Sequence, residues 1–355
     1  MNNDRIQEIL DLMEEARLDY FLISDPQSIA YCTGYYNDPH ERMFVFMISK
    51  HGNHTLFMND LFYLEHDLDV NIVWHKDGQD AIQTIVDEMH FPGRIGIDKN
   101  WASHFLLDLM KKLPDAKYIN ASPCVDLVRM KKDLQEQVLM IESSKINDAV
   151  MEEIIPFIQE GVTEKQLAKK LDELFFNHHS TCYGAIVAFG KNAADPHHEN
   201  DDTPLRKGDC VLIDMGCVYK GYCSDMTRTF FYEGILEEEI KVYEIVKKAN
   251  EAAEAMIKPG VKLSDIDKCA RKVISDEGYG KYFTHRLGHF IGRDVHEYGD
   301  VSSVNEMEVE EGMIFSIEPD IYLEGNFGVR VEDLVMVTKD RCQVLNSFTK
   351  DIYII

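Results

Sequence analysis

The sequence has few positive charges and no long hydrophobic run, and each absence excludes a class of protein. Lysine and arginine number 37 against 63 aspartates and glutamates in 355 residues, which gives a net charge of −26. Nucleic acids and anionic membranes are recognised by clustered lysine and arginine, so we expect neither as a partner. No stretch approaches the ~18 uninterrupted apolar residues of a membrane span, and residues 1–10 lack the apolar core of a signal peptide.

The cysteines also lack the spacing of a metal or disulfide framework. None of the eight forms a CxxC pair, although Cys210, Cys217 and Cys223 lie near one another in the sequence. Structural zinc sites usually pair cysteines about two to four residues apart. We therefore expect reduced thiols and a cytoplasmic location. The GxSxG elbow of serine hydrolases is absent as well, which disfavours that class of enzyme.

What is present is the composition of a globular protein, with 45% hydrophobic and 28% charged residues. In the first part of the chain, apolar residues at helical spacing alternate with short strand-like runs. This order predicts a small α/β domain over residues 1–125. The expected helices cover residues 4–17, 79–90 and 102–113, and the expected strands cover residues 20–24, 43–49, 55–58, 94–98 and 117–120.

The rest of the chain predicts a second, larger domain. A charged helical pattern indicates a linker helix within residues 126–160, and Thr163 with Gln166 forms a capping box at the start of a domain over residues 161–355. Two helices followed by strands then occur twice, which indicates an α+β fold with a pseudo two-fold repeat. The expected helices cover residues 163–178, 237–257 and 263–277, and the expected strands cover residues 185–190, 209–215, 219–232, 313–322 and 329–337.

Four acidic residues of this second domain lie inside apolar runs. Asp214, Asp225, Glu318 and Glu332 are each flanked by valine, isoleucine, phenylalanine or methionine. A buried carboxylate costs several kcal/mol unless a cation or a partner neutralises it. For any one of the four, a buried ion pair with an arginine such as Arg228 or Arg330 is an equally good explanation; four together suggest a metal site.

Histidines accompany these acids. His285, His289 and His296 lie in one segment, where Gly288 and Gly292 disfavour a helix and instead indicate a loop or strand close to a site. His197 lies in a further loop, after Asp195-Pro196.

Together the acids and His289 predict a metal-binding set. Oxygen-rich ligation with one imidazole suits Mn²⁺, Co²⁺ or Zn²⁺, and four carboxylates carry enough negative charge for two divalent cations. The predicted metal ligands are Asp214, Asp225, His289, Glu318 and Glu332.

These motifs together carry a family resemblance. Asp214 and Asp225 lie eleven residues apart, followed by the His-x-x-Gly-His run of 285–289, by Ile-Glu-Pro at 317–319 and by Arg-Val-Glu-Asp at 330–333. The set resembles the pita-bread metallopeptidases, and within them the Xaa-Pro group, whose members include prolidases and Xaa-Pro aminopeptidases. The first domain, with Leu22–Pro26 and Tyr31–Tyr35, resembles the creatinase-type N-terminal domain of that family.

The resemblance implies a role for each residue of the site. Asp214 would hold one metal ion, Asp225 and Glu332 would bridge both, and His289 and Glu318 would complete the other, manganese being the expected ion. Glu318 would also transfer the proton of the attacking water. His197, His285 and His296 would line the substrate pocket and stabilise the tetrahedral intermediate. Arg330 would orient the acids or bind substrate.

Two residues depart from the family pattern, and one loop suggests a partner contact. Phe290 and Asp320 stand where the family usually has glycine, which puts the pocket shape in doubt. Homodimers are usual in the family, and in them the partner's first domain approaches the active site. We therefore expect Asp38, His40 or Glu41 of one subunit to meet Arg293 of the other; an ordinary solvated turn is an equal alternative.

The expected function is metal-dependent hydrolysis of Xaa-Pro dipeptides. An alternative is Xaa-Pro aminopeptidase activity on longer peptides, which differs in whether the cleft is closed beyond proline. A remote alternative is a binding module that has the same fold and no catalysis.

Overall fold

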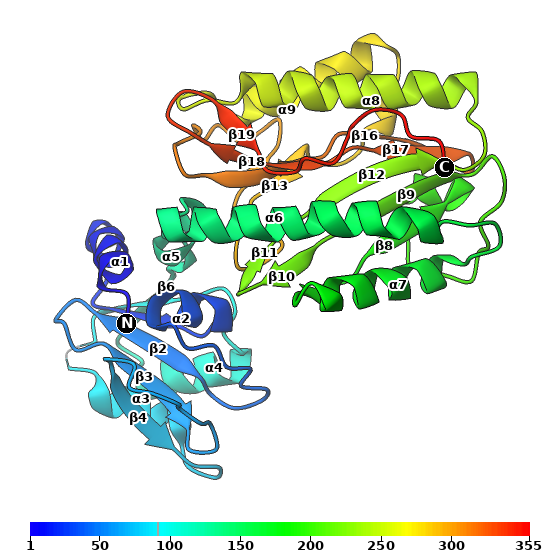
Figure 1. The fold of residues 1–355 in the computed structure, drawn as a ribbon. Coiled ribbons are helices and arrows are strands. Elements are labelled where there is room, and N and C mark those ends of the chain that lie inside the picture. Colours follow the sequence, from blue (N-terminus) through cyan, green and yellow to red (C-terminus); the bar gives the residue numbers. More distant parts are fainter. Residues whose placement is uncertain (91) are drawn as a thin grey trace. The chain divides into compact units, whose positions relative to one another are not determined.

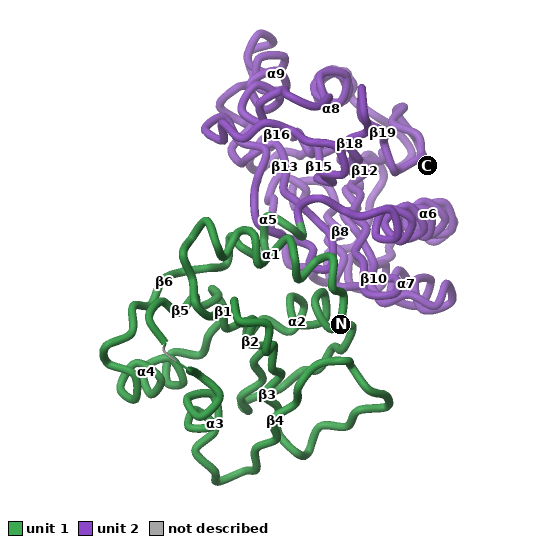
Figure 2. The backbone as a smooth tube through the Cα atoms, turned by 90° about the vertical axis from the view of Figure 1, so that its left-hand side faces the viewer, with its two compact units in different colours: residues 1–129 green, residues 130–355 purple. Residues whose placement is uncertain are grey.

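Two separate units are formed by residues 1–90 and 92–355, which are the residues that the computed structural model describes. The first unit comprises residues 1–129 and the second comprises residues 130–355 (Figure 2). The division thus falls after Arg129, a few residues beyond the position expected from the sequence. The helix expected in the linker, α6 (Leu134–Ile154), lies within the second unit.

The first unit is a six-stranded mixed sheet with helices on both faces (Figure 1). Successive residues of its central strand enter different cores: Phe21 and Ile23 pack with α1, α2 and α5, whereas Tyr20 and Leu22 pack with α3 and α4. Strand β4 was not predicted. In sheet order the strands are β4 (Asn71–His75), β3 (Thr55–Asn59), β2 (Val45–Ser49), β1 (Tyr20–Ile23), β5 (Arg94–Ile97) and β6 (Lys117–Asn120), and the helices are α1 (Asn3–Glu15), α2 (Pro26–Thr33), α3 (Ala81–Glu88), α4 (Ser103–Lys112) and α5 (Ser122–Met130).

The second unit repeats one order of elements. Helices α6 and α7 (Glu164–Asn177) precede the first group of strands, and α8 (Glu237–Met256) and α9 (Leu263–Asp276) precede the second. The two helix pairs lie on opposite sides of the strands (Figures 1 and 2). The capping box at Thr163 and Gln166 is confirmed at the start of α7. The first strands are β7 (Thr181–Cys182), β8 (Ile186–Phe189), β9 (Cys210–Met215), β10 (Cys217–Tyr219), β11 (Tyr222–Cys223) and β12 (Met226–Phe231), and the second are β13 (Gly288–His289), β14 (Asp300–Val301), β15 (Ile314–Ile317), β16 (Asp320–Leu323), β17 (Phe327–Arg330), β18 (Asp333–Val337) and β19 (Cys342–Val344).

Three strands that the sequence predicts as continuous are interrupted, so the predictions for 219–232, 313–322 and 329–337 were wrong in this respect. The physical reason is a change of sheet: β15 and β18 pair in one sheet, whereas β16 and β17 pair in another. The chain must therefore end its pairing in one sheet before it begins pairing in the other. Pro319, which has no backbone N–H, lies at one such break. Asp225, Glu318 and Glu332 lie at the three breaks.

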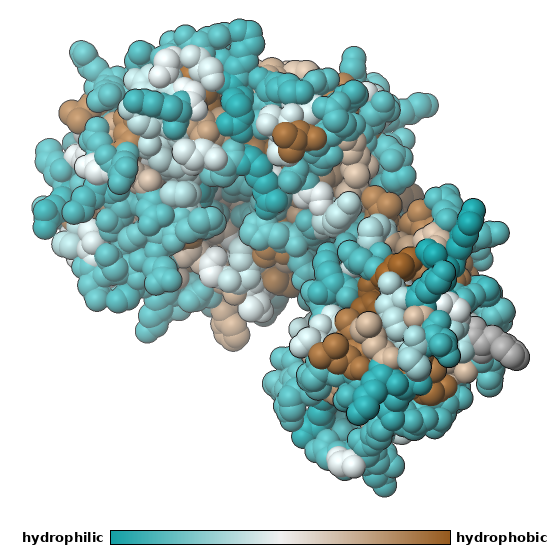
Figure 3. Space-filling model, turned by 180° about the vertical axis from the view of Figure 1, so that it is seen from behind, coloured by the Kyte–Doolittle hydropathy of each residue, from teal (hydrophilic) through white to brown (hydrophobic). Residues whose placement is uncertain are grey.

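Hydrophilic side chains cover most of the visible face of the second unit, as the acidic composition leads one to expect (Figure 3). None of the described helices is both long and apolar enough to cross a membrane.

A buried arginine joins the two groups of strands in the second unit. The guanidinium of Arg228, on β12, is bonded to Asp333 Oδ1 at 2.7 Å and donates to the carbonyl oxygens of Glu332 at 2.7 Å and Phe348 at 2.9 Å. Only 1% of Arg228 is exposed. Its charge is therefore compensated by the Asp333 carboxylate and by backbone carbonyl groups of the strand ends and the C-terminal segment.

We expect Arg228→Met to lower the free energy of unfolding by about 3–5 kcal/mol, because it leaves a buried carboxylate and several carbonyl groups short of a donor. Chemical denaturation measures this change. Lys262→Met is the control: its ion pair with Glu306 is exposed, so the loss should stay below about 1 kcal/mol. Equal losses in the two variants would contradict a structural role for Arg228.

Candidate active site

The pairing of β9 with β12 brings three of the predicted acids toward one another. Asp214 on β9 is directly opposite Thr227 on β12, and Asp225 lies just before β12. The Thr227 hydroxyl donates to Glu332 Oε2 at 2.7 Å, and the backbone N–H of Glu332 donates to the Thr227 carbonyl at 3.1 Å. Thr227 therefore fixes the carboxylate of Glu332 beside the other two acids.

The close approach of β13 to β15 brings in His289 and Glu318. A side chain at position 288 would place its Cβ 1.9 Å from the carbonyl oxygen of Ser316, so only glycine permits this approach. The backbone N–H of His289 then donates to Ser316 Oγ at 3.0 Å, and that hydroxyl donates to Glu318 Oε1 at 3.1 Å. His289 Nε2 lies 3.6 Å from both Asp225 Oδ2 and Glu318 Oε1.

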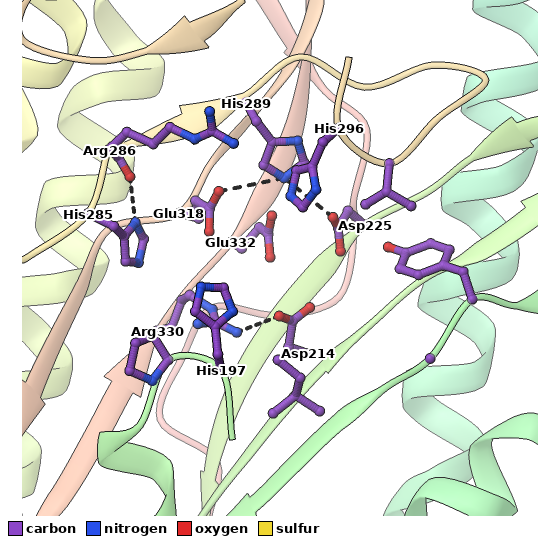
Figure 4. A pocket seen from close by; sticks show the side chains of 15 residues that line it. His197, Asp214, Asp225, His285, Arg286, His289, His296, Glu318, Arg330 and Glu332 are labelled. Carbon is purple, nitrogen blue, oxygen red and sulfur yellow. Dashed lines mark hydrogen bonds and ion pairs between the residues drawn. The ribbon is translucent and has the colours of Figure 1, made fainter. Parts of the chain in front are cut away.

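All five predicted metal ligands line one cavity of about 450 Å³ (Figure 4). Asp225, His289 and Glu332 each offer a ligand atom, and these atoms lie within 4.8 Å of one another. Asp214 and Glu318 border the same space, and the carboxyl groups point into it (Figure 4). Acidic oxygens with one imidazole are the donors that borderline divalent cations prefer, so the residues fit such ions.

Burial and mutual repulsion perturb these groups, as is typical of acids gathered at a cation site. Burial, followed by the charge of neighbouring carboxylates, raises the pKa of Asp225 and of Glu332 well above the usual range. Burial raises the pKa of Glu318 and lowers the pKa of His289 to about 4. His289 is thus neutral at neutral pH and available as a ligand, and a bound cation would relieve the repulsion among the acids.

The ion-pair alternative holds for only one of the four acids. Arg330 forms an ion pair with Asp214, and its other nitrogens donate to Thr227 Oγ1 and Tyr322 Oη. Arg228 pairs with Asp333 instead of with a candidate ligand. Asp225, Glu318 and Glu332 therefore face the cavity without an arginine ion pair among the described residues.

The predicted substrate residues divide into those that line the cavity and one that does not. His197, His285, His296 and Arg330 are all lining residues. The His296 ring lies 4.2 Å from the His289 ring, and burial lowers the pKa of His296. Arg293 is not a lining residue; its guanidinium carbon lies 5.4 Å from the centre of the Tyr222 ring.

The expected partner contact of the N-terminal loop stays a prediction. Within the first unit, Glu41 and Asp77 are both bonded to Arg42 at 2.9 Å, and His40 lies 3.8 Å from Asp38. These contacts leave Asp38 and His40 largely exposed, as a contact with another subunit would need.

Sequence reasoning missed several residues that build the site. Thr227 and Ser316 orient two of the carboxylates, and the carbonyl of Arg286 lies 2.6 Å from His285 Nδ1. Tyr183 lines the cavity and donates to the Ser224 carbonyl at 2.8 Å. Thr227 follows Asp225 by two residues, a spacing that would place both on one side of the strand predicted over residues 219–232, and this was the available signal.

We expect Glu332→Gln to raise the Tm of the metal-free protein by about 2–4 °C. The folded state raises the pKa of Glu332, so its ionisation at neutral pH opposes folding, and the amide removes that charge while it still accepts from Thr227. Thermal melting in chelator measures the shift, with the exposed Glu306→Gln as control. The same Glu332 variant should lose most of the stabilisation that Mn²⁺ gives the parent. A lower Tm in the metal-free variant would contradict this account.

Comparison with known proteins agrees with this geometry. The chain matches metallopeptidase family M24 over residues 138–339 and the creatinase/prolidase N-terminal domain over residues 5–131. An uncharacterized peptidase of Staphylococcus aureus is 34% identical over 355 residues, which cover 98% of this chain and 99% of the relative.

Solved structures show the same likeness. The prolidase from Thermococcus sibiricus is 32% identical, with a TM-score of 0.94 over 100% of this chain and 99% of its own. The X-Pro aminopeptidase from Thermotoga maritima is 28% identical, with a TM-score of 0.85 over 97% of this chain and 100% of its own. The resemblance seen in the motifs is confirmed: the chain is a peptidase that belongs to metallopeptidase family M24, with a creatinase-type N-terminal domain.

Proposed function

We propose that this peptidase hydrolyses Xaa-Pro dipeptides with two divalent cations, manganese being the expected ion and cobalt or zinc the alternatives. The observation that carries the proposal is the convergence of four carboxylates and a neutral histidine on one cavity. We assign Asp214 to one cation, Asp225 and Glu332 to both, and His289 and Glu318 to the other. Two cations so held would lower the pKa of a water molecule and polarise the carbonyl group before proline.

Glu318 is the proposed proton carrier. Its Oε1 accepts from the Ser316 hydroxyl, which fixes the carboxylate toward the cavity, and burial raises its pKa above the usual range, which favours uptake of a proton. In the proposed reaction, Glu318 takes the proton of the attacking water and delivers it to the proline nitrogen as the bond to the carbonyl carbon breaks.

His197, His285, His296 and Arg330 are the proposed substrate residues. They enter the cavity from three segments of the second unit, namely the loop of His197, the segment 285–296 and β17, so together they can surround a short peptide (Figure 4). We assign the histidines to stabilising the tetrahedral intermediate, and Arg330, which is bonded to Asp214, to orienting the acidic cluster. Arg293 is assigned to the mouth of the site through the expected partner loop.

The size of the cavity favours a dipeptide. About 450 Å³ lies near the lower end of the ~300–1,000 Å³ typical of small-molecule sites. The Xaa-Pro bond has no N–H, so a site for it must recognise a compact ring in place of an extended strand. Aminopeptidase activity on longer peptides is the second candidate, which the likeness to the Thermotoga enzyme favours. We also propose a cytoplasmic homodimer.

We expect Glu318→Gln to lower kcat at least ~10²-fold, because the amide cannot accept a proton. Steady-state kinetics on Leu-Pro measures the loss, and metal analysis of the same sample shows whether the cations are retained. Glu306→Gln, an exposed change, serves as the control. Unchanged turnover in a fully metal-loaded Glu318→Gln protein would defeat the proton-transfer role.

Substrate length separates the two candidate activities. With Mn²⁺ restored after EDTA treatment, we expect Leu-Pro to be cleaved at least ~10-fold more efficiently than Leu-Pro-Xaa tripeptides, since the small cavity favours two residues over three. Comparison of kcat/KM for the two substrates gives the answer. A preference for the tripeptides would favour the aminopeptidase, and full activity after EDTA would contradict metal dependence.

A further inference from the structure

Asp320 is a buried carboxylate that the proposed mechanism does not use. It lies on β16, two residues after Glu318, and its side chain is 0% exposed. Asp320 Oδ2 lies 2.5 Å from His285 Nε2 as an ion-pair contact, and neither carboxylate oxygen accepts a hydrogen bond of regular geometry from the described residues. An uncompensated carboxylate in such a place is destabilising, and the adjacent imidazole compensates Asp320, with a smaller contribution from the charge of Arg330.

The His285 ring is held from both sides. Its Nδ1 lies 2.6 Å from the carbonyl oxygen of Arg286, and its Nε2 faces Asp320. The backbone is fixed too, because Arg271 donates to the His285 carbonyl at 2.9 Å. Each ring nitrogen therefore lies beside a protein oxygen, which restricts rotation of the ring.

Asp320 lies behind the cavity wall, while His285 forms part of that wall. Asp320 is paired with Arg330 across β16 and β17, so the two side chains are on the same face of this sheet as Tyr322, two residues on. His285 and Arg330 line the cavity, whereas Asp320 does not. Any influence of Asp320 on substrate is thus transmitted through a neighbour, and His285 is the neighbour that it contacts.

We propose that Asp320 is a positioning residue that, together with the Arg286 carbonyl, fixes the orientation of the His285 imidazole in the cavity wall. The His285 ring then does not have to be ordered when substrate binds. Because positions of reacting groups must be held to a fraction of an ångström, loss of the carboxylate should weaken catalysis without removing any group that touches substrate. The catalytic part of this inference rests on the proposed function.

A double-mutant cycle tests the coupling. Asp320→Leu keeps the branching at Cγ without an acceptor, whereas Asp320→Asn keeps an oxygen that can accept from Nε2. On Leu-Pro we expect Asp320→Leu to lower kcat/KM about 10- to 100-fold, Asp320→Asn to restore most of it, and Asp320→Leu to have no further effect in a His285→Phe background. Equal losses from Leu and Asn, or the same loss in both backgrounds, would overturn the proposal.

A buried carboxylate remote from His285 provides the matched control. Asp148 accepts from the backbone N–H groups of Ser347 and Phe348. Asp148→Leu should lower stability, and its effect on kcat/KM should be the same with and without His285→Phe. Thermal melting and metal analysis of every variant identify any that fail to fold or to bind metal; the Asn variant keeps the test decisive if the Leu variant does not fold.

A measurement without substrate separates this inference from the proposed function. In the zinc-loaded full-length protein with ¹⁵N-labelled histidine, we expect a slowly exchanging, downfield Nε2–H proton that disappears in His285→Phe and Asp320→Leu and persists in Asp320→Asn. Its absence from the parent protein would overturn the positioning role. Its presence in a protein that does not cleave Xaa-Pro peptides would instead reject the proposed function and leave the positioning role standing.

Discussion

The second unit brings carboxylates that repel one another to a single cavity. Asp225, Glu318 and Glu332 each have a raised pKa, and burial is the largest cause in every case. A fold selected for stability alone would not gather these groups, because the desolvation cost of each exceeds the offset from the nearby charge of Arg330. Bound divalent cations would relieve the repulsion among the carboxylates. The proposed metal site therefore explains why these acids are gathered.

The strands place the acids by changing sheets. β15 and β18 pair with each other, β16 and β17 pair in a second sheet, and the chain crosses between the sheets at Glu318 and at Glu332. Side chains at such crossings are not committed to either sheet face, so they can point into the space between. Gly288 permits the close approach that adds His289, and Thr227 and Ser316 then orient two of the carboxylates.

The candidate site residues could be predicted from the sequence, but the way in which the strands bring them together could be predicted only in part. A carboxylate inside an apolar run such as that around Asp214 stands out without any structure, and helix signals such as the capping box at Thr163 are local. The strand breaks are not local, because they depend on which distant strand becomes the partner. For the same reason the sequence marked Asp320 only as a departure from the family pattern, and could not predict its contact with His285.

Location of the metal ions in crystals grown with Mn²⁺ tests the central claim most directly, by anomalous diffraction at the manganese edge. The account predicts two adjacent peaks in the cavity, with oxygens of Asp214, Asp225, Glu318 and Glu332 and a nitrogen of His289 as protein ligands. A cavity that remains without any peak at saturating Mn²⁺, or one in which the carboxylates are neutralised by arginine side chains alone, would contradict it.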